Sequence, residues 1–193
     1  MRKYIMSLII MVMALPGSYA QLQKHGFNIS AGVFSSNFFD AVNTDILGDQ
    51  QINGMISKNI ETQTGAIFIT YRYFPSVKLS LGWTAGLERL TGDIQIDASG
   101  AGRYYNDYYT GAFEIDYRYV LKRRFQVYSG GALGVTFKNE SNEIPSYTES
   151  EQDILLAYQL NAVGIRFGGI AGVFAEAGFG YKGFIKFGLN LQL

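Results

Sequence analysis

The stretch AEAGFGYKGFIKFGLNLQL (Ala175–Leu193) decides the fold. From Ile185 onward, an apolar side chain alternates with a polar or small one, which is the pattern of a β-strand with two unlike faces. An apolar strand with an unpaired edge promotes aggregation, so natural proteins pair or cover such strands. We therefore expect this strand to have partners on both edges, and its apolar face to have an apolar environment.

The same period of two recurs throughout the preceding sequence. In each stretch, apolar side chains fall on one face, while Gly, Ala, Ser, Thr and charged side chains fall on the other. The pattern predicts eight strands in all, at residues 27–33, 64–73, 77–88, 109–119, 125–138, 155–167, 173–182 and 185–193. In the sixth of these, the apolar phase changes between Leu160 and Val163, which indicates either a β-bulge or a misassigned segment.

The connections between these strands differ in length at the two ends. Four connections are short, at 74–76, 121–124, 168–172 and 182–183. Three are long, at 36–61, 91–107 and 139–153. Short turns at one end and long loops at the other are typical of a transmembrane β-barrel, in which the turns are periplasmic and the loops extracellular. We therefore predict an all-β fold, an eight-stranded antiparallel transmembrane β-barrel.

The long connections are acidic, although the whole chain has 16 acidic and 16 basic residues. They contain only two bases, Lys58 and Arg103, and twelve acids: Asp40, Asp45, Asp49, Glu61, Asp93, Asp97, Asp107, Glu140, Glu143, Glu149, Glu151 and Asp153. We expect these segments to be extracellular loops. No nucleic acid is expected as a partner, because the only run of bases, Lys122-Arg123-Arg124, lies in a short turn.

The amino-terminal sequence MRKYIMSLIIMVMALPGSYAQ has the three parts of a secretory signal peptide. Arg2 and Lys3 are positive, residues 5–15 are apolar, and Ser18-Tyr19-Ala20 is a suitable cleavage site. We predict a cleaved signal peptide at 1–20 and a barrel domain at 21–193; the alternative is a buried amino-terminal helix. Cysteine is absent, so an exported chain of this kind does not depend on disulfides.

Alternation alone does not distinguish a membrane barrel from a soluble lipocalin-like barrel or sandwich, in which the apolar face is internal. Two features favour an apolar outer face. Small residues and opposite charges share the polar face and would fill a narrow lumen. Aromatic residues gather at strand ends. At about 3.3 Å per residue and a tilt of about 40°, the strand from Tyr109 to Tyr119 spans a height of about 25 Å, which matches the apolar band of such barrels.

Ten charged side chains fall on the polar face: Arg72, Lys78, Glu88, Glu114, Asp116, Arg118, Lys138, Glu176, Lys182 and Lys186. Charges enclosed in a narrow barrel need partners of opposite sign. We predict a structural charge network in the lumen that includes Lys78, Glu88, Glu114, Asp116, Arg118, Lys138, Glu176 and Lys186. The alternative is a minor channel for small polar solutes or ions, in which Glu114 would affect conductance.

The export signal, the eight strands and the ending GFGYKGFIKFGLNLQL resemble the small outer-membrane β-barrel family, of the outer-membrane protein X or A transmembrane-domain type. The closing Gly-Phe-Gly-Tyr-Lys-Gly is similar to that of members from the Bacteroidetes. The resemblance implies a cell outer-membrane location, contact with outer-membrane lipids and lipopolysaccharide, and insertion by the outer-membrane assembly machinery. The machinery reads the final strand, so the resemblance assigns an assembly signal to Phe187, Leu189, Leu191 and Leu193. Leu193 stands where members usually carry an aromatic residue.

The sequence offers few residues for catalysis. His25 is the single histidine; with Ser30 it allows the alternative of an outer-membrane lipid-modifying enzyme, but no acid lies nearby in the sequence. We predict no catalytic site, no cofactor and a monomer with a structural or surface-interaction role.

The first acidic segment contains possible oxygen ligands for a hard cation: Asp40, Asn43, Asp45 and Asp49. Their spacing matches no EF-hand, and we expect a solvated loop without a metal site. A weaker hypothesis is that the acidic loops gather magnesium ions that bridge to lipopolysaccharide phosphates.

Overall fold

The computed structural model describes residues 24–40, 56–63, 65–96, 100–144 and 147–193. The predicted signal peptide and most of the first acidic segment therefore lie outside the described residues. The described chain forms a short helix at 36–40 and these strands: β1 (His25–Val33), β2 (Ile56–Gln63), β3 (Ala66–Tyr73), β4 (Leu79–Ile96), β5 (Gly100–Lys122), β6 (Phe125–Ile144), β7 (Tyr147–Gly168), β8 (Ala171–Gly180) and β9 (Ile185–Gln192). None of the helical residues described belongs to a helix long and apolar enough to cross a membrane.

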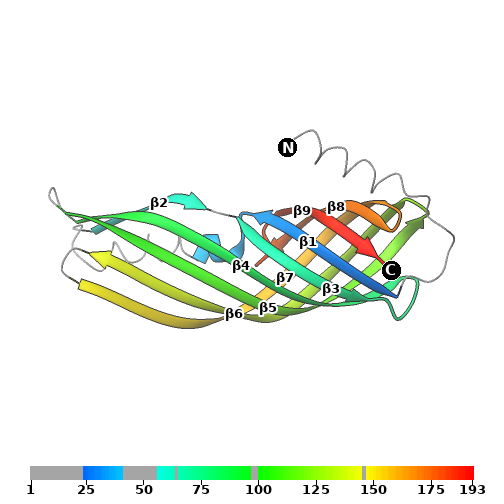
Figure 1. Cartoon of the computed structure of the whole chain (residues 1–193), viewed down its shortest axis with the longest axis horizontal. Helices are drawn as coiled ribbons and strands as arrows, with labels where there is room; N and C mark the ends of the chain where they lie inside the picture. The colour runs from blue at the N-terminus through cyan, green and yellow to red at the C-terminus, as the bar shows by residue number, and fades with distance from the viewer. Residues whose placement is uncertain (1–23, 41–55, 64, 97–99, 145–146) are drawn as a thin grey trace.

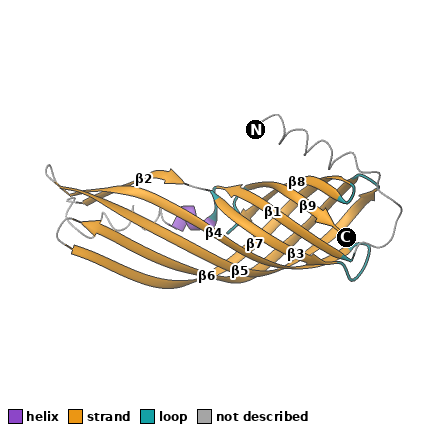
Figure 2. Ribbon diagram, in the orientation of Figure 1, coloured by secondary structure: helices purple, strands orange, loops and turns teal. Residues whose placement is uncertain are grey.

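The strands form one closed antiparallel sheet (Figures 1 and 2). Each strand pairs with its neighbours, β9 pairs with β1, and the β4–β5 pairing completes the ring. β2 and β3 both pair with β4, β2 along Leu90–Ile96 and β3 along Leu81–Leu87, so the two strands share one place in the ring. The eight-stranded barrel is therefore confirmed. The closing strand is also as predicted, since Leu191 lies opposite Phe27.

The two faces of the sheet have opposite character. Apolar side chains point outward and are uncovered: Trp83 is 66% exposed and Leu133 is 65% exposed. Charged side chains point into the lumen, where Arg72, Glu114 and Lys186 are all buried. A soluble barrel has the reverse distribution. The arrangement is that of a transmembrane barrel, whose apolar outer face lies in lipid.

The apolar belt ends at the same register position on four successive strands. Leu87, Tyr109, Phe137 and Ile154 lie opposite one another and are its last outward row. The next outward row is polar, and consists of Arg89, Asp107, Asn139 and Gln152. The Arg89 guanidinium contacts the Asp107 carboxylate there at 2.5 Å, and this contact raises the pKa of Arg89 above its usual value.

Beyond this polar row, β4, β5, β6 and β7 continue as strands (Figure 1). The prediction of loops at 91–107 and 139–153 was wrong, because backbone pairing extends from Leu79 to Ile96 and from Tyr147 to Gly168 on β4 and β7. The predicted loop at 36–61 was wrong as well, since it contains the helix at 36–40 and the start of β2 at Ile56. Outward side chains above the lipid have no reason to be apolar, so the alternation ends before the strand does. We call this side of the barrel the hairpin end, and the side of the turns at 74–78, 122–125 and 168–171 the short-turn end.

A β-bulge lies in β7, the sixth strand predicted. Asn161 is opposite Gly178 and Val163 is opposite Ala177, so Ala162 is an extra residue. Its carbonyl accepts a hydrogen bond of 2.6 Å from the Ser129 hydroxyl on β6. The bulge is confirmed, and it turns the apolar side chains on both sides of Ala162 toward lipid.

Candidate functional site in the barrel lumen

A four-residue charge cluster occupies the middle of the lumen. The Arg72 guanidinium, from β3, lies 3.4 Å from Glu114, 3.0 Å from Asp116 and 3.5 Å from Glu176. The two acids of β5 point inward because they are two residues apart on a strand, and Glu176 faces them from β8. We call these residues the Arg72 cluster. One cation thus binds acids from both sides of the barrel.

Further donors contact these carboxylates, although the buried Oδ1 of Asp116 has no hydrogen-bond partner among the described residues. The Tyr128 hydroxyl donates to Glu176 at 2.8 Å, and the Ser80 hydroxyl donates to Asp116 at 3.2 Å. The Lys186 ammonium lies 2.5 Å from the second Glu176 oxygen. Buried charges are tolerated when they are paired and hydrogen-bonded in this way.

The turn between β8 and β9 folds into the lumen from the hairpin end. Tyr181 and Lys182 are fully buried, although the turn that carries them is a surface connection by topology. The Lys182 ammonium pairs with Glu114 and donates to the Thr84 hydroxyl at 3.2 Å. Tyr181 donates to Glu114 at 3.4 Å. The turn is therefore bonded directly to β5 across the lumen.

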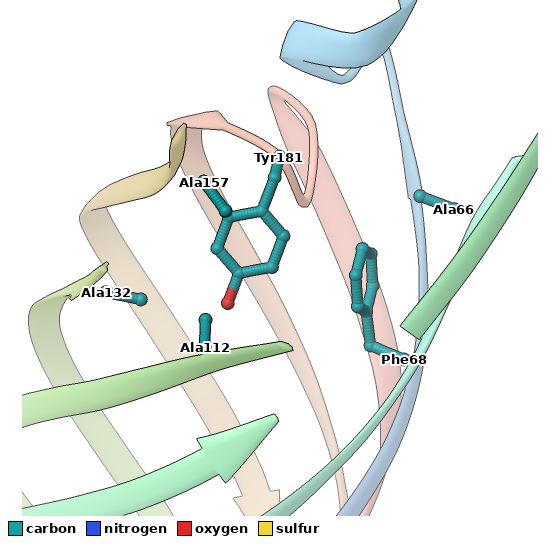
Figure 3. Packing of buried hydrophobic residues seen from close by; sticks show 6 residues of the cluster. All are labelled: Ala66, Phe68, Ala112, Ala132, Ala157 and Tyr181. Carbon is teal, nitrogen blue, oxygen red and sulfur yellow. The ribbon is translucent and has the colours of Figure 1, made fainter. Parts of the chain in front are cut away.

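Small residues make room for the Tyr181 ring. Figure 3 shows the ring beside Phe68 and near alanines of three strands, Ala112, Ala132 and Ala157, while Ala66 lies on the other side of Phe68. The Phe68 and Tyr181 rings meet edge to face, with centroids 5.4 Å apart. Gly32 is needed next to the turn, because a Cβ there would lie 1.8 Å from the carbonyl oxygen of Lys182. The lumen is filled by side chains at this level.

The short helix at 36–40 is attached inside the mouth of the hairpin end. The Ser35 hydroxyl, at its start, donates to both oxygens of Glu88 at 2.7 Å and accepts the amide hydrogen of Phe38. Asn37 donates to Glu88 at 3.0 Å. Phe38 packs against Leu90 and Tyr108. Next to Tyr108, on the neighbouring strand β6, the Lys138 ammonium lies 3.9 Å from Asp40 and 3.2 Å from Glu140.

Most residues of the predicted charge network are brought into the lumen. Glu88, Glu114, Asp116, Arg118, Lys138, Glu176 and Lys186 are buried there. Lys78 is not: it is exposed in the turn before β4, because that strand begins at Leu79. Its assignment to the lumen was wrong, since the alternation was extended two residues into a turn.

Arg166 is a further lumen charge, outside the predicted network. It is 3% exposed and projects inward from β7. The change of apolar phase in this strand concealed it, although its position between Ile165 and Phe167 places it on the polar face once the bulge is recognised. Arg72 and Lys182 were on the predicted polar face but outside the named network; both are central to it.

The residues considered for catalysis and metal binding are separated or lie outside the described part. His25 is exposed on the outer face, where its Nδ1 is 2.8 Å from the Tyr71 hydroxyl, whereas Ser30 faces the lumen. Asp40 belongs to the helix, and Asn43, Asp45 and Asp49 lie outside the described residues. Within the ranges that are described, no three His, Cys, Asp or Glu side chains are grouped to hold a metal.

The predicted assembly residues lie on the outer face at the closing seam. Phe187, Leu189 and Leu191 alternate outward along β9, and the exposed Leu193 follows them. Hydrogen bonds with His25 extend the pairing to the end of the chain: Leu193 donates to His25 at 2.7 Å, and His25 donates back at 2.9 Å.

Comparisons with known proteins give limited information. No protein-family model and no curated protein matches the sequence. Among solved structures, the chain is similar to the crystal structure of Ail, the attachment invasion locus protein of Yersinia pestis. The TM-score is 0.44 with 12% identity, and the match covers 88% of this chain and 93% of that one. A likeness of this strength indicates nothing about function.

Proposed function

We propose that the chain is an integral protein of the Gram-negative outer membrane that acts without catalysis and presents acidic β-hairpins to partners at the cell surface. The uncovered apolar belt supports residence in lipid. A barrel of this kind carries its longer connections on the extracellular side, so the hairpin end would face outward. Outer-membrane lipids and lipopolysaccharide would surround it, and the outer-membrane assembly machinery would insert it as a monomer.

The observation that supports the surface role is that β7 extends further than its neighbour β8 at the hairpin end. β7 begins at Tyr147, but its pairing with β8 begins only at Gln159. The Tyr158 carbonyl accepts a backbone hydrogen bond from Tyr181, so over residues 147–157 the pairing described for β7 is with β6 alone. A free strand edge offers backbone hydrogen bonds to an added strand. The sequence of residues 147–157 contains three acids and no base, a charge that would limit unspecific association and favour a basic partner.

The lumen gives less support to the channel alternative. The Arg72 cluster and the inserted β8–β9 turn place buried side chains across the barrel. The enzyme alternative is not favoured either, because His25 and Ser30 project to opposite faces of β1.

Cysteine labelling on cells would test the proposed orientation, since the chain has no cysteine of its own. A membrane-impermeant maleimide should label Gln152→Cys on intact cells. Lys122→Cys, in a short turn, should be labelled only after the outer membrane is permeabilised. Leu133→Cys, in the apolar belt, should be labelled only after detergent extraction. Labelling of Lys122→Cys but not of Gln152→Cys on intact cells would reverse the orientation, and labelling of all three would exclude a membrane barrel.

A further inference from the structure

Two buried guanidinium groups at the short-turn end of the lumen form no ion pair with a carboxylate of the described residues. Arg118 and Arg166 are 8% and 3% exposed. Arg118 stacks 4.2 Å from the centre of the Phe74 ring and donates one long hydrogen bond, 3.5 Å, to the carbonyl of Ser76. Its buried Nε has no hydrogen-bond partner. A buried charge without an opposite charge is costly, so this arrangement calls for an anion.

Arg166 is held by neutral acceptors only. It donates to the carbonyls of Gly168 and Gly169, at 3.1 and 2.6 Å, and to the Asn190 side chain. The acids nearest the middle of the lumen bind other cations, namely Arg72, Lys182 and Lys186.

The two arginines lie on the same inner surface with one strand between them. Arg118 of β5 is opposite Tyr128 of β6, and Gln126 of β6 is opposite Arg166 of β7. The hydrogen bonds to Ser76, Gly168 and Gly169 place both guanidinium groups at the level of the short turns. They therefore flank the mouth of the barrel on this side.

The surroundings of the mouth are strongly positive. The three short turns contain four bases, Lys78, Lys122, Arg123 and Arg124, and no Asp or Glu side chain. Among the described lumen residues between Glu88 and this mouth, five cations face three carboxylates. The cations are Arg72, Arg118, Arg166, Lys182 and Lys186, and the carboxylates are Glu114, Asp116 and Glu176. The excess of two positive charges equals the charge of a phosphate dianion.

We propose that the short-turn mouth binds a phosphate group between Arg118 and Arg166. Guanidinium groups present paired N–H donors that match phosphate oxygens, and the unpartnered Nε of Arg118 supplies one of them. The phosphate could belong to free inorganic phosphate or to the headgroup of an anionic phospholipid. The second source rests on the proposed function, in which this mouth faces the periplasm and the inner lipid leaflet; the first does not.

Calorimetric titration of the full chain, folded in a maltoside detergent, would test the free-phosphate source. Inorganic phosphate is added at neutral pH against a chloride background of constant ionic strength. We expect binding that weakens about tenfold or more in Arg118→Gln and in Arg166→Gln, because each loses a charge-assisted hydrogen bond. Arg89→Gln, an arginine of the hairpin end, should bind as the unmodified chain does. Arg118→Lys retains the charge and should fold and bind with an intermediate affinity, which keeps the test decisive if a glutamine variant does not fold.

Urea unfolding in lipid vesicles would test the headgroup source. Phosphatidylcholine vesicles are compared with vesicles that also contain phosphatidylglycerol. If the headgroup is bound, phosphatidylglycerol should raise the unfolding midpoint of the unmodified chain and of Lys122→Gln, but not that of Arg118→Gln. The proposal is overturned if neither free phosphate nor phosphatidylglycerol has an effect that depends on Arg118 and Arg166. It is also overturned if Lys122→Gln loses the effect as fully as Arg118→Gln, since the attraction would then belong to the whole rim.

Discussion

The ammonium group of Lys182 is paired with the carboxylate of Glu114, which fastens the β8–β9 turn to the inner face of β5. Their side chains are only 1% and 3% exposed. Glu114 also accepts from Tyr181 and lies 3.4 Å from Arg72. One carboxylate thus joins the inserted turn to the Arg72 cluster, and two buried cations share its charge.

Replacing Glu114 by Gln should destabilise the barrel strongly. Glutamine is nearly the same size but leaves the Lys182 ammonium buried without an opposite charge. Breaking a buried ion pair from one side costs about 3–5 kcal/mol, so we expect the free energy of unfolding to fall by about that amount. Urea unfolding in vesicles can be followed by the fluorescence of Trp83, the only tryptophan, which is 66% exposed on the outer face.

Two matched variants separate this effect from a general loss of charge. Asp107→Asn removes a carboxylate from the exposed Arg89 pair, where water solvates both groups, so a far smaller loss is expected. Adding Lys182→Met to Glu114→Gln should restore part of the stability, because no unpaired charge remains. Equal losses in Glu114→Gln and Asp107→Asn would contradict a buried pair in the lumen.

The alanines around Tyr181 should not tolerate larger residues. In Ala112→Leu, the added side chain would occupy the space of the Tyr181 ring (Figure 3) and displace the turn. Overpacking of this kind costs about 1–3 kcal/mol. The same substitution at Ala177, which faces lipid on β8, should be neutral. Comparing the unfolding midpoints of the two variants in vesicles tests this; equal midpoints would mean that Tyr181 does not fill the lumen.

The extent to which the sequence predicted the fold depended on whether side chains faced lipid. Between Phe27 and Leu193, alternation located the eight places in the ring, because lipid on one side and buried polar groups on the other require opposite residue types. It did not locate β2. Above the polar row that begins with Arg89, both faces can be polar, so the strand extensions to Ile96 and from Tyr147 had no apolar alternation to mark them.

The charged residues of the lumen were predicted less completely, because the direction of a side chain is uncertain at the end of a strand. Glu114 and Asp116 were placed in the lumen because they lie well inside a strand. Lys78 and Lys182 both flank strand ends, where the alternation does not indicate whether a side chain points into the lumen. Lys78 is exposed, whereas Lys182 is fully buried. Which turn folds inward depends on space inside the barrel, and that space is made by alanines of other strands.

The apolar belt should reject a charge according to depth. Leu133 pairs with Phe113 near the middle of the belt, and both point outward. Leu133→Arg should lower the free energy of unfolding in vesicles by about 2–4 kcal/mol, the cost of a basic residue near the bilayer midplane. Gln152→Arg, in the polar row above the belt, should have little effect. If both arginines are tolerated equally, this face of β6 does not contact lipid.

The end of the chain should be needed for assembly in cells more than for folding itself. Leu193 is paired through its backbone with His25, while its side chain is 57% exposed on the outer face. If the assembly machinery reads this residue, Leu193→Asp should lower the amount of folded barrel in outer membranes several-fold yet fold in vesicles without the machinery. Leu193→Phe should reach normal levels. Leu121→Asp places the same charge on the outer face at the same end, but away from the final strand. Heat-dependent gel mobility of membrane fractions measures each level; if Leu193→Asp and Leu121→Asp are reduced equally, the effect comes from charge at the lipid boundary and not from a signal in β9.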